Sequence, residues 1–220
     1  MCDLYSLTKG KAAIRELTRA AIDRAGDWTP MPGIFPDDSA PVVRYIDGAR
    51  VLSLMRWGMP STTFALKGRT NDPGVTNIRD TKSPHWRQWL PAEHRCLVPF
   101  TSFTEHEATG DRRRAPVWFA AGEERPMMVF AGLWTRWTSV RKSADVEVTV
   151  DAFGLLSSDA NKTVGAVNPK TMPVILTDPD EMDLWLRAPW PQAAKLQRPF
   201  PEDGLQIVAR GKRSDGAKRA

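Results

Sequence analysis

RCLVPFTSFTEHE, from Arg95 to Glu107, opens the most strand-rich part of the chain. Its apolar, aromatic and β-branched residues are typical of strands, and similar segments follow it. These segments are PVWFA (116–120), MMVFAGLW (127–134), VDAFGLLS (150–157), PVILT (173–177) and LQIVA (205–209). Strands therefore dominate the middle of the chain, with helical patterns on its flanks. This order predicts an α+β fold with a mainly antiparallel, barrel-like sheet.

The first third of the chain is expected to contain a helix and a hairpin. Residues 8–25 show a helical repeat of apolar positions, with Thr8 as the expected cap. VVRYI (42–46) and VLSLM (51–55) are typical of short strands, and Asp47-Gly48 between them is a hairpin turn signal.

Two further helices are expected later in the chain. Residues 83–90 have Ser83 as a candidate cap and a proline at the first helical position. Residues 178–186 begin with Asp178 as a cap, and Glu181 is expected to complete a capping box.

The composition is that of a globular protein without a membrane anchor. The 220 residues are 41% hydrophobic and 26% charged, and they contain no apolar run of about 18 residues that could span a bilayer. Since no export signal is visible and two cysteines cannot form a disulfide framework, we expect a protein of the reducing cytoplasm. We also expect one domain over residues 1–210, followed by a solvated, disordered basic tail over 211–220.

Neither the net charge nor a known sequence motif identifies a catalytic, nucleotide-binding or metal site. The net charge of +5 permits an acidic partner such as nucleic acid but does not require one. The sequence contains no Walker loop, GxGxxG motif, GxSxG elbow or HExxH helix. His85, His94 and His106 lack the cysteine or carboxylate spacing of a zinc site, so no metal and no organic cofactor is expected.

Cys2 is a candidate nucleophile for a chemical reason. Removal of Met1 would leave a cysteine whose free amine and thiol stand on adjacent carbons, and such a group condenses with an aldehyde to a thiazolidine. Reference pKa values of about 7.7–8.0 for the amine and about 8.5 for the thiol make both nucleophilic forms accessible near neutral pH. Taken alone, Cys2 could also be an unremarkable small residue.

Further segments appear in a distinctive order behind Cys2. They are RWGMP (56–60), TNIRD (76–80), RCLVPFTSFTEHE (95–107), FAGLW (130–134) and MPVIL (172–176). The set resembles the SRAP family (SOS-response-associated peptidases), proteins that crosslink to abasic sites in single-stranded DNA. The resemblance runs over nearly the whole chain and implies the SRAP fold.

The resemblance assigns roles to particular residues. It implies that Cys2 attacks the ring-opened deoxyribose aldehyde and that Glu105 is the acid and base, with Glu107 ranked lower. Asn77 would orient the sugar or the terminal amine, and Arg79 would bind phosphate.

Two positions depart from the family pattern. Members commonly carry an arginine at position 4, where this chain has Leu4, and a histidine before MPVIL, where Asn168 is the expected equivalent. An asparagine can donate a hydrogen bond but cannot exchange a proton near neutral pH. We therefore expect Asn168 to replace the histidine at the catalytic site but to serve proton transfer poorly.

Other candidate DNA contacts have equally good structural explanations. Trp57 and Met59 could stack at the lesion or pack under the sheet. Arg113, in the basic run 112–114, could contact the DNA backbone or lie in a solvated loop. WTRWTSVRK (134–142) interleaves tryptophans with basic residues, as single-strand grooves do.

The resemblance implies a monomeric DNA-damage protein that links Cys2 to abasic single-stranded DNA and acts near replication forks. It also implies release of Met1, either autocatalytic or by an aminopeptidase, and lyase-like Schiff-base chemistry. Two alternatives remain: a single-stranded-DNA-binding SRAP variant without catalysis, and an amidohydrolase whose N-terminal cysteine is the nucleophile.

Overall fold

The computed structural model describes residues 2–107, 115–142 and 146–216. Its strands are β1 (Tyr5–Leu7), β2 (Ile22–Asp23), β3 (Met31–Ile34), β4 (Ser39–Ile46), β5 (Ala49–Trp57), β6 (Asn77–Ile78), β7 (Arg95–Phe100), β8 (Ser102–His106), β9 (Pro116–Ala120), β10 (Met128–Ser139), β11 (Val148–Ser158), β12 (Met172–Pro173), β13 (Ile175–Leu176) and β14 (Gln206–Arg210). Its α-helices are α1 (Lys11–Thr18), α2 (Thr63–Leu66), α3 (Lys162–Gly165), α4 (Pro179–Arg187) and α5 (Trp190–Ala193). Short 3-10 helices cover Arg87–Trp89, Ala92–His94, Ala194–Leu196 and Glu202–Gly204.

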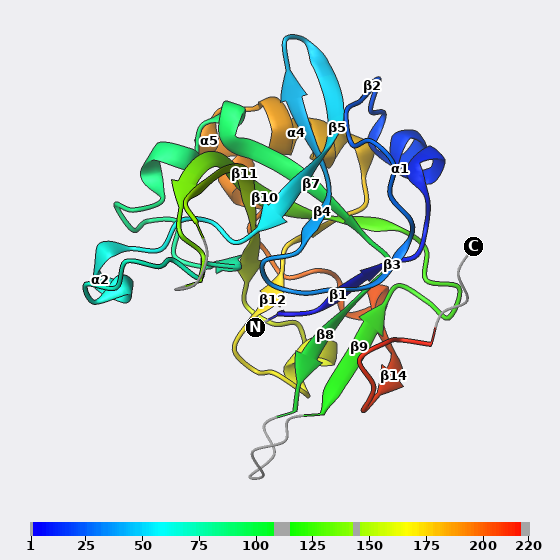
Figure 1. Cartoon of the computed structure of the whole chain (residues 1–220). Helices are drawn as coiled ribbons and strands as arrows, with labels where there is room; N and C mark the ends of the chain where they lie inside the picture. Colours follow the sequence, from blue (N-terminus) through cyan, green and yellow to red (C-terminus); the bar gives the residue numbers. More distant parts are fainter. Residues whose placement is uncertain (1, 108–114, 143–145, 217–220) are drawn as a thin grey trace.

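Five strands close into a barrel. They pair in the order β11-β10-β7-β4-β5, and β5 pairs back to β11 in parallel, with Arg56 opposite Ala152 and Trp57 opposite Phe153. The other pairs in this ring are antiparallel. The expected α+β fold with a barrel-like, mainly antiparallel sheet is therefore confirmed, and Figure 1 shows helices α4 and α5 beside it.

A second sheet extends from the barrel and joins distant parts of the chain. Its order is β14-β9-β8-β1-β3, so the first strand lies beside β8 (Figure 1). Tyr5 pairs with Phe103 and Ser6 with Ser102 in this antiparallel contact. Only Thr101 separates β8 from the barrel strand β7, which fixes the second sheet against the barrel.

Aromatic side chains fill the space where the two sheets meet. The rings of Phe100 and Phe130 stack with centroids 3.6 Å apart, and the edge of Phe103 meets Phe130 at 5.9 Å. Tyr5 packs edge-on against Trp57 and Phe130. Because all five side chains are fully buried, the strand that follows Cys2 is anchored in the same core as the barrel.

The hairpin was predicted correctly, since Asp47 and Gly48 both have positive φ (48° and 85°) between β4 and β5. Helix α4 also begins as predicted, with the Asp178 carboxylate accepting from the N–H of Asp180 at 2.7 Å. Glu181, which was expected to complete a capping box, forms an ion pair with Arg198 instead.

Two helix predictions were wrong in part. Helix α1 covers only Lys11–Thr18: Thr8 bonds to Thr101 on the neighbouring turn and caps nothing, while Arg19 adopts a left-handed conformation that ends the helix. Residues 22–23 then pair with β5 as β2. Segment 83–90 forms turns and a single 3-10 turn, because the two buried indoles of Trp86 and Trp89 pack against the core.

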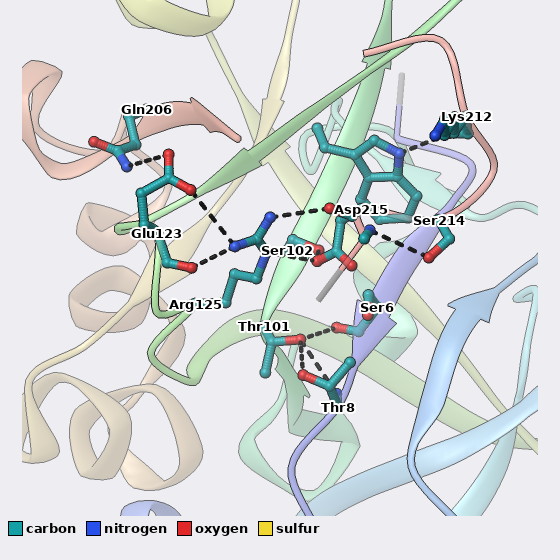
Figure 2. Close-up of polar contacts among 12 residues, drawn as sticks. Ser6, Thr8, Thr101, Ser102, Glu123, Arg125, Gln206, Lys212, Ser214 and Asp215 are labelled. Carbon is teal, nitrogen blue, oxygen red and sulfur yellow. Dashed lines mark hydrogen bonds and ion pairs between the residues drawn. The ribbon is translucent and has the colours of Figure 1, made fainter. Parts of the chain in front are cut away.

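The expected tail is described as far as residue 216, and two of its residues contact the rest of the fold. Trp118 Nε1 donates to the carbonyl of Lys212 at 2.8 Å. Asp215 is 3% exposed, and its carboxylate accepts hydrogen bonds from Ser102 Oγ (2.6 Å) and Arg125 Nε (3.2 Å). Figure 2 shows these groups converging. Residues 211–214 and 216 are exposed to solvent, whereas Asp215 is buried and charge-assisted hydrogen bonds compensate its carboxylate.

Candidate functional site

Cys2 is held in place although it precedes the first strand. The residue is fully buried, and its carbonyl oxygen accepts a hydrogen bond from Asn77 Nδ2 at 2.6 Å. Its thiol lies 3.7 Å from the carbonyl oxygen of Leu4, which also accepts from the N–H of Thr104 on β8 at 2.9 Å. The first residues of the chain are thus fixed from β8 on one side and from Asn77 on the other.

Asn77 is held against the barrel strand β11. It lies on the short strand β6, which pairs in parallel with β11 so that Asn77 is opposite Leu155. The side chain is 9% exposed, and its Nδ2 also donates to Thr76 Oγ1 at 2.9 Å. An amide fixed in this way can orient residue 2, in line with the role implied by the resemblance.

Glu105 lies on β8, beside the segment that carries Cys2. It is 1% exposed, and burial raises the pKa of its carboxyl group above the ordinary value. A hydrogen bond from Asn168 opposes part of that rise, while the charge of Asp3 adds to it. A carboxyl group with a raised pKa can donate and accept a proton closer to neutral pH, which suits acid–base work.

Asn168 meets Glu105 from the opposite side. Its Nδ2 donates to Glu105 Oε2 at 2.8 Å and lies 3.4 Å from the carbonyl oxygen of Thr171. Its Oδ1 accepts from the N–H of Lys170 at 3.2 Å. The loop between α3 and β12 therefore aims a fixed amide at the carboxylate, and the structure brings all four predicted catalytic residues into one group.

The Cys2 thiol is neutral at physiological pH in this arrangement. Burial raises its pKa well above the usual value, and the negative charges of Glu105 and Asp3 raise it further. The chain here still carries Met1, which lies outside the described residues, so the nitrogen of Cys2 is part of a peptide bond. In this form Cys2 has neither a free amine nor a thiolate.

Arg79 is engaged with the protein. Its guanidinium donates to the carbonyls of Ser158 (3.1 Å) and Lys170 (2.7 Å) and forms an ion pair with Asp159. These contacts tie the end of β11 to the loop that carries Asn168. With 41% of its side chain exposed, Arg79 could still meet a phosphate, and that role stays a prediction.

The other predicted DNA contacts are placed differently. Trp57 and Met59 are fully buried, and Trp57 Nε1 donates to the carbonyl of Thr76 at 3.1 Å, which favours packing under the sheet over stacking on bases. Arg113 lies outside the described residues. In the segment 134–142, Arg141 is buried and bonds to Asp37, Gly58 and Pro73, while Arg136 is exposed.

Leu4 is buried, and His85 and His94 each contact a backbone carbonyl. Leu4 is 4% exposed, so its side chain offers nothing to a phosphate. His85 Nε2 contacts the Pro60 carbonyl at 2.9 Å, and His94 Nδ1 contacts that of Trp134 at 3.1 Å. Within residues 2–107, 115–142 and 146–216, no group of three His, Cys, Asp or Glu side chains is arranged to hold a metal ion.

Sequence reasoning missed two residues beside this group. His106 Nδ1 lies 3.5 Å from Asp3 Oδ1, and each of the two directly follows a predicted catalytic residue. No local signal in the sequence predicts their contact, because it depends on how β1 pairs with β8.

Solved structures share the fold. A protein from Bordetella bronchiseptica superposes with a TM-score of 0.72 at 22% identity, covering 96% of this chain and 100% of its own. A protein from Bacteroides thetaiotaomicron gives 0.68 at 21% identity, covering 94% and 92%. A phage-related protein from Bordetella bronchiseptica gives 0.70 at 19% identity, with the same coverage.

The described helices include none long and apolar enough to cross a membrane. A search of the curated proteins found no match. The family model described as "SOS response associated peptidase (SRAP)" matches residues 1–212, nearly the full length of the chain. The chain therefore belongs to the SOS response associated peptidase (SRAP) family, which is associated with DNA damage.

Proposed function

We propose that this protein, once Met1 has been removed, forms a covalent bond between Cys2 and an abasic site in single-stranded DNA. The observation that carries the proposal is the group formed by Cys2, Asn77, Glu105 and Asn168. It combines a fixed N-terminal cysteine with a buried carboxyl group whose pKa is raised. Neither feature alone would suggest a reaction with an aldehyde.

The chemistry needs only groups of this chain and the ring-opened sugar. Hydrolysis of the Met1–Cys2 peptide bond consumes one water and frees the amine of Cys2. That amine adds to the aldehyde carbon, and loss of one water gives an imine. The thiol then adds across the C=N bond, its sulfur bonding to carbon and its proton passing to nitrogen, which closes the thiazolidine ring.

Glu105 acts both as a proton donor and as a proton acceptor in this sequence. In its neutral form it donates a proton to the departing oxygen when the sugar ring opens and when water leaves. As a carboxylate it accepts a proton from the attacking amine or thiol. Its buried position next to Asn168 supports this role, because the amide keeps the carboxyl group oriented without competing for the proton.

The surroundings of Cys2 also support an order of events. While Met1 is attached, the nitrogen is an amide and the buried thiol is held neutral by its raised pKa. Removal of Met1 supplies the amine that starts the reaction. We therefore expect the unprocessed chain to be inert toward an aldehyde.

Binding to single-stranded DNA without catalysis is the second candidate. Leu4 favours it, because the buried leucine offers no cation at a position where a phosphate contact is expected. The two candidates differ in substrate: the covalent reaction requires an abasic site, whereas a binding module would take intact DNA equally well.

A denaturing gel tests the proposal. Untagged, processed protein is incubated with a single-stranded oligonucleotide that carries one abasic site. We expect a heat-stable shifted band that is absent with undamaged DNA, with Cys2→Ala and with a chain extended before Met1. A band that persists in Cys2→Ala, or no band with the wild-type protein, would refute covalent attachment through Cys2.

A further inference from the structure

Asp3 and His106 form a contact beside the catalytic group that the proposed chemistry does not use. Asp3 directly follows Cys2, and His106 directly follows Glu105 on β8. His106 Nδ1 lies 3.5 Å from Asp3 Oδ1, with 25% of the histidine side chain and 54% of the aspartate side chain exposed. One contact thus links the neighbour of the nucleophile to the neighbour of the acid.

This contact lies beyond the end of the backbone ladder. Pairing of β1 with β8 includes Tyr5 and Ser6, and the last backbone hydrogen bond toward the N-terminus is that from Thr104 to Leu4. Asp3 and His106 continue the attachment by one side-chain contact. They act from the β8 side, opposite the hydrogen bond that Asn77 makes to Cys2.

The contact also has an electrostatic consequence for both reacting residues. After burial, the charge of Asp3 is among the causes that raise the pKa of the Cys2 thiol and of the Glu105 carboxyl group. A protonated imidazole beside Asp3 would offset that charge, and imidazoles gain and lose their proton close to neutral pH.

Within the part of the chain that the structure describes, the other ionisable groups on the segments beside the pair include Cys2, Glu105, Glu107 and Arg210. Glu107 forms an ion pair with Arg210 of β14, and the β9 residue opposite His106 is Pro116, which carries no charge. Among the described ion pairs, His106 is thus the cationic partner of Asp3.

We propose that His106 is a positioning residue that acts through Asp3 on Cys2, and that its protonation favours formation of the DNA adduct. The inference rests on the proposed function. Protonated His106 holds the segment that carries the nucleophile and offsets the charge of Asp3. Neutral His106 leaves that charge to oppose ionisation of the thiol.

The pH profile of the crosslinking rate tests the electrostatic part. His106→Gln keeps a polar side chain facing Asp3 but never carries a charge. We expect it to react about twofold to fivefold more slowly than wild type at pH 6, in line with a partly exposed ion pair, and at the same rate at pH 8.5. Glu107→Gln breaks the neighbouring pair with Arg210 and serves as the matched control, with a ratio to wild type that does not change with pH.

Amide hydrogen exchange tests the positioning part without DNA. The N–H of Thr104, which donates to Leu4, should exchange faster in His106→Ala and Asp3→Ala than in wild type at pH 6. The double variant should exchange no faster than either single variant if the two side chains act as one tether.

The outcomes separate this inference from the proposed function. If the wild-type protein crosslinks normally and His106→Gln has the same pH profile as the wild type, the inference is overturned. If wild type gives no crosslink but exchange at Thr104 responds to both substitutions, the proposed function fails and the tether stands. Unchanged exchange in both single variants removes the positioning role.

Discussion

The two cysteines of this chain are equally buried and differ in the groups that surround them. Cys2 and Cys96 are both 0% exposed, and burial raises the pKa of each thiol above its ordinary value. Cys96 lies in the barrel strand β7, where its residue pairs with Gly132 on one side and Arg44 on the other, and its carbonyl accepts from Trp185 Nε1 at 3.0 Å.

Cys2 has neighbours of another kind. Its carbonyl is held by a side-chain amide, and the charges that act on its thiol are those of Glu105 and Asp3. Burial therefore keeps both thiols in the neutral form. Only Cys2 can gain a free amine and has a neighbouring carboxyl group that can exchange protons. In the proposed reaction, Cys2 differs from Cys96 through its place at the processed end of the chain and not through its thiol as such.

The largest expected effect separates the two cysteines directly. Cys96→Ala should keep the heat-stable DNA adduct at the wild-type level, whereas Cys2→Ala should lose it completely. The alanine at the processed end still carries an α-amine, so borohydride should trap an imine with Cys2→Ala. A reductant-independent band in that variant would contradict the thiazolidine.

Removal of the carboxyl group should have the next largest effect. Glu105→Gln should slow adduct formation about 10²-fold, which is the usual size for loss of a general acid or base. Glu107→Gln is the control, because Glu107 pairs with Arg210 outside the group, and its rate should stay within about twofold of wild type. Single-turnover time courses on denaturing gels measure both.

The same substitution should change stability in a pH-dependent way. Because burial raises the folded-state pKa of Glu105, its contribution is favourable below the ordinary carboxyl pKa and is lost as pH rises through the raised value. Glu105→Gln should be as stable as wild type at pH 4 and more stable at pH 8. The difference in unfolding free energy should be about 1.4 kcal/mol for each unit by which folding raises the pKa of Glu105. Urea titrations at the two pH values measure this, and equal stability at pH 8 would argue against a raised pKa.

On the Cys96 side, a change in packing should affect stability and leave the chemistry intact. A Cβ at Gly132 would lie 2.9 Å from Cys96 Sγ and 3.1 Å from the Gly154 carbonyl oxygen, so Gly132→Ala should cost about 1–3 kcal/mol of unfolding free energy. Gly122→Ala, which meets nothing within 4 Å, is the matched control. Adding Cys96→Ala should recover part of the loss, and a Gly132→Ala variant as stable as wild type would contradict the close contact.

The smallest effect is expected at Asn168. Asn168→His would place an imidazole where an amide now donates to Glu105, and so supply a group that exchanges protons near neutral pH. We expect release of the adduct to speed up severalfold while its formation changes little. Unchanged release kinetics would remove the hypothesis that the asparagine limits proton transfer.

The fold class was predictable from local patterns, whereas the residues of the candidate site were assigned through the resemblance to the SRAP family. Strand-rich segments, the Asp47-Gly48 turn and the cap at Asp178 are signals contained in a few adjacent residues. Helix α1 was overestimated because its end depends on residues 22–23 pairing with β5, a contact between distant segments.

Burial also depends on such distant contacts. Trp57 follows a strand pattern that fits either the core or an exposed face, and only closure of β5 onto β11 decides that it lies inside. The contact of Asp3 with His106 requires the register of β1 against β8, which local propensity does not supply.

The buried Asp215 has a consequence for how the chain is made. Ser102, on the strand that pairs with β1, receives its buried partner Asp215 only after a further 113 residues have been synthesised. Until then the first strand lacks β8 or β8 lacks Asp215, so the N-terminus emerges from the ribosome long before its contacts with β8 are complete. An enzyme that removes Met1 would meet an open chain end during that interval, ahead of the burial of Cys2.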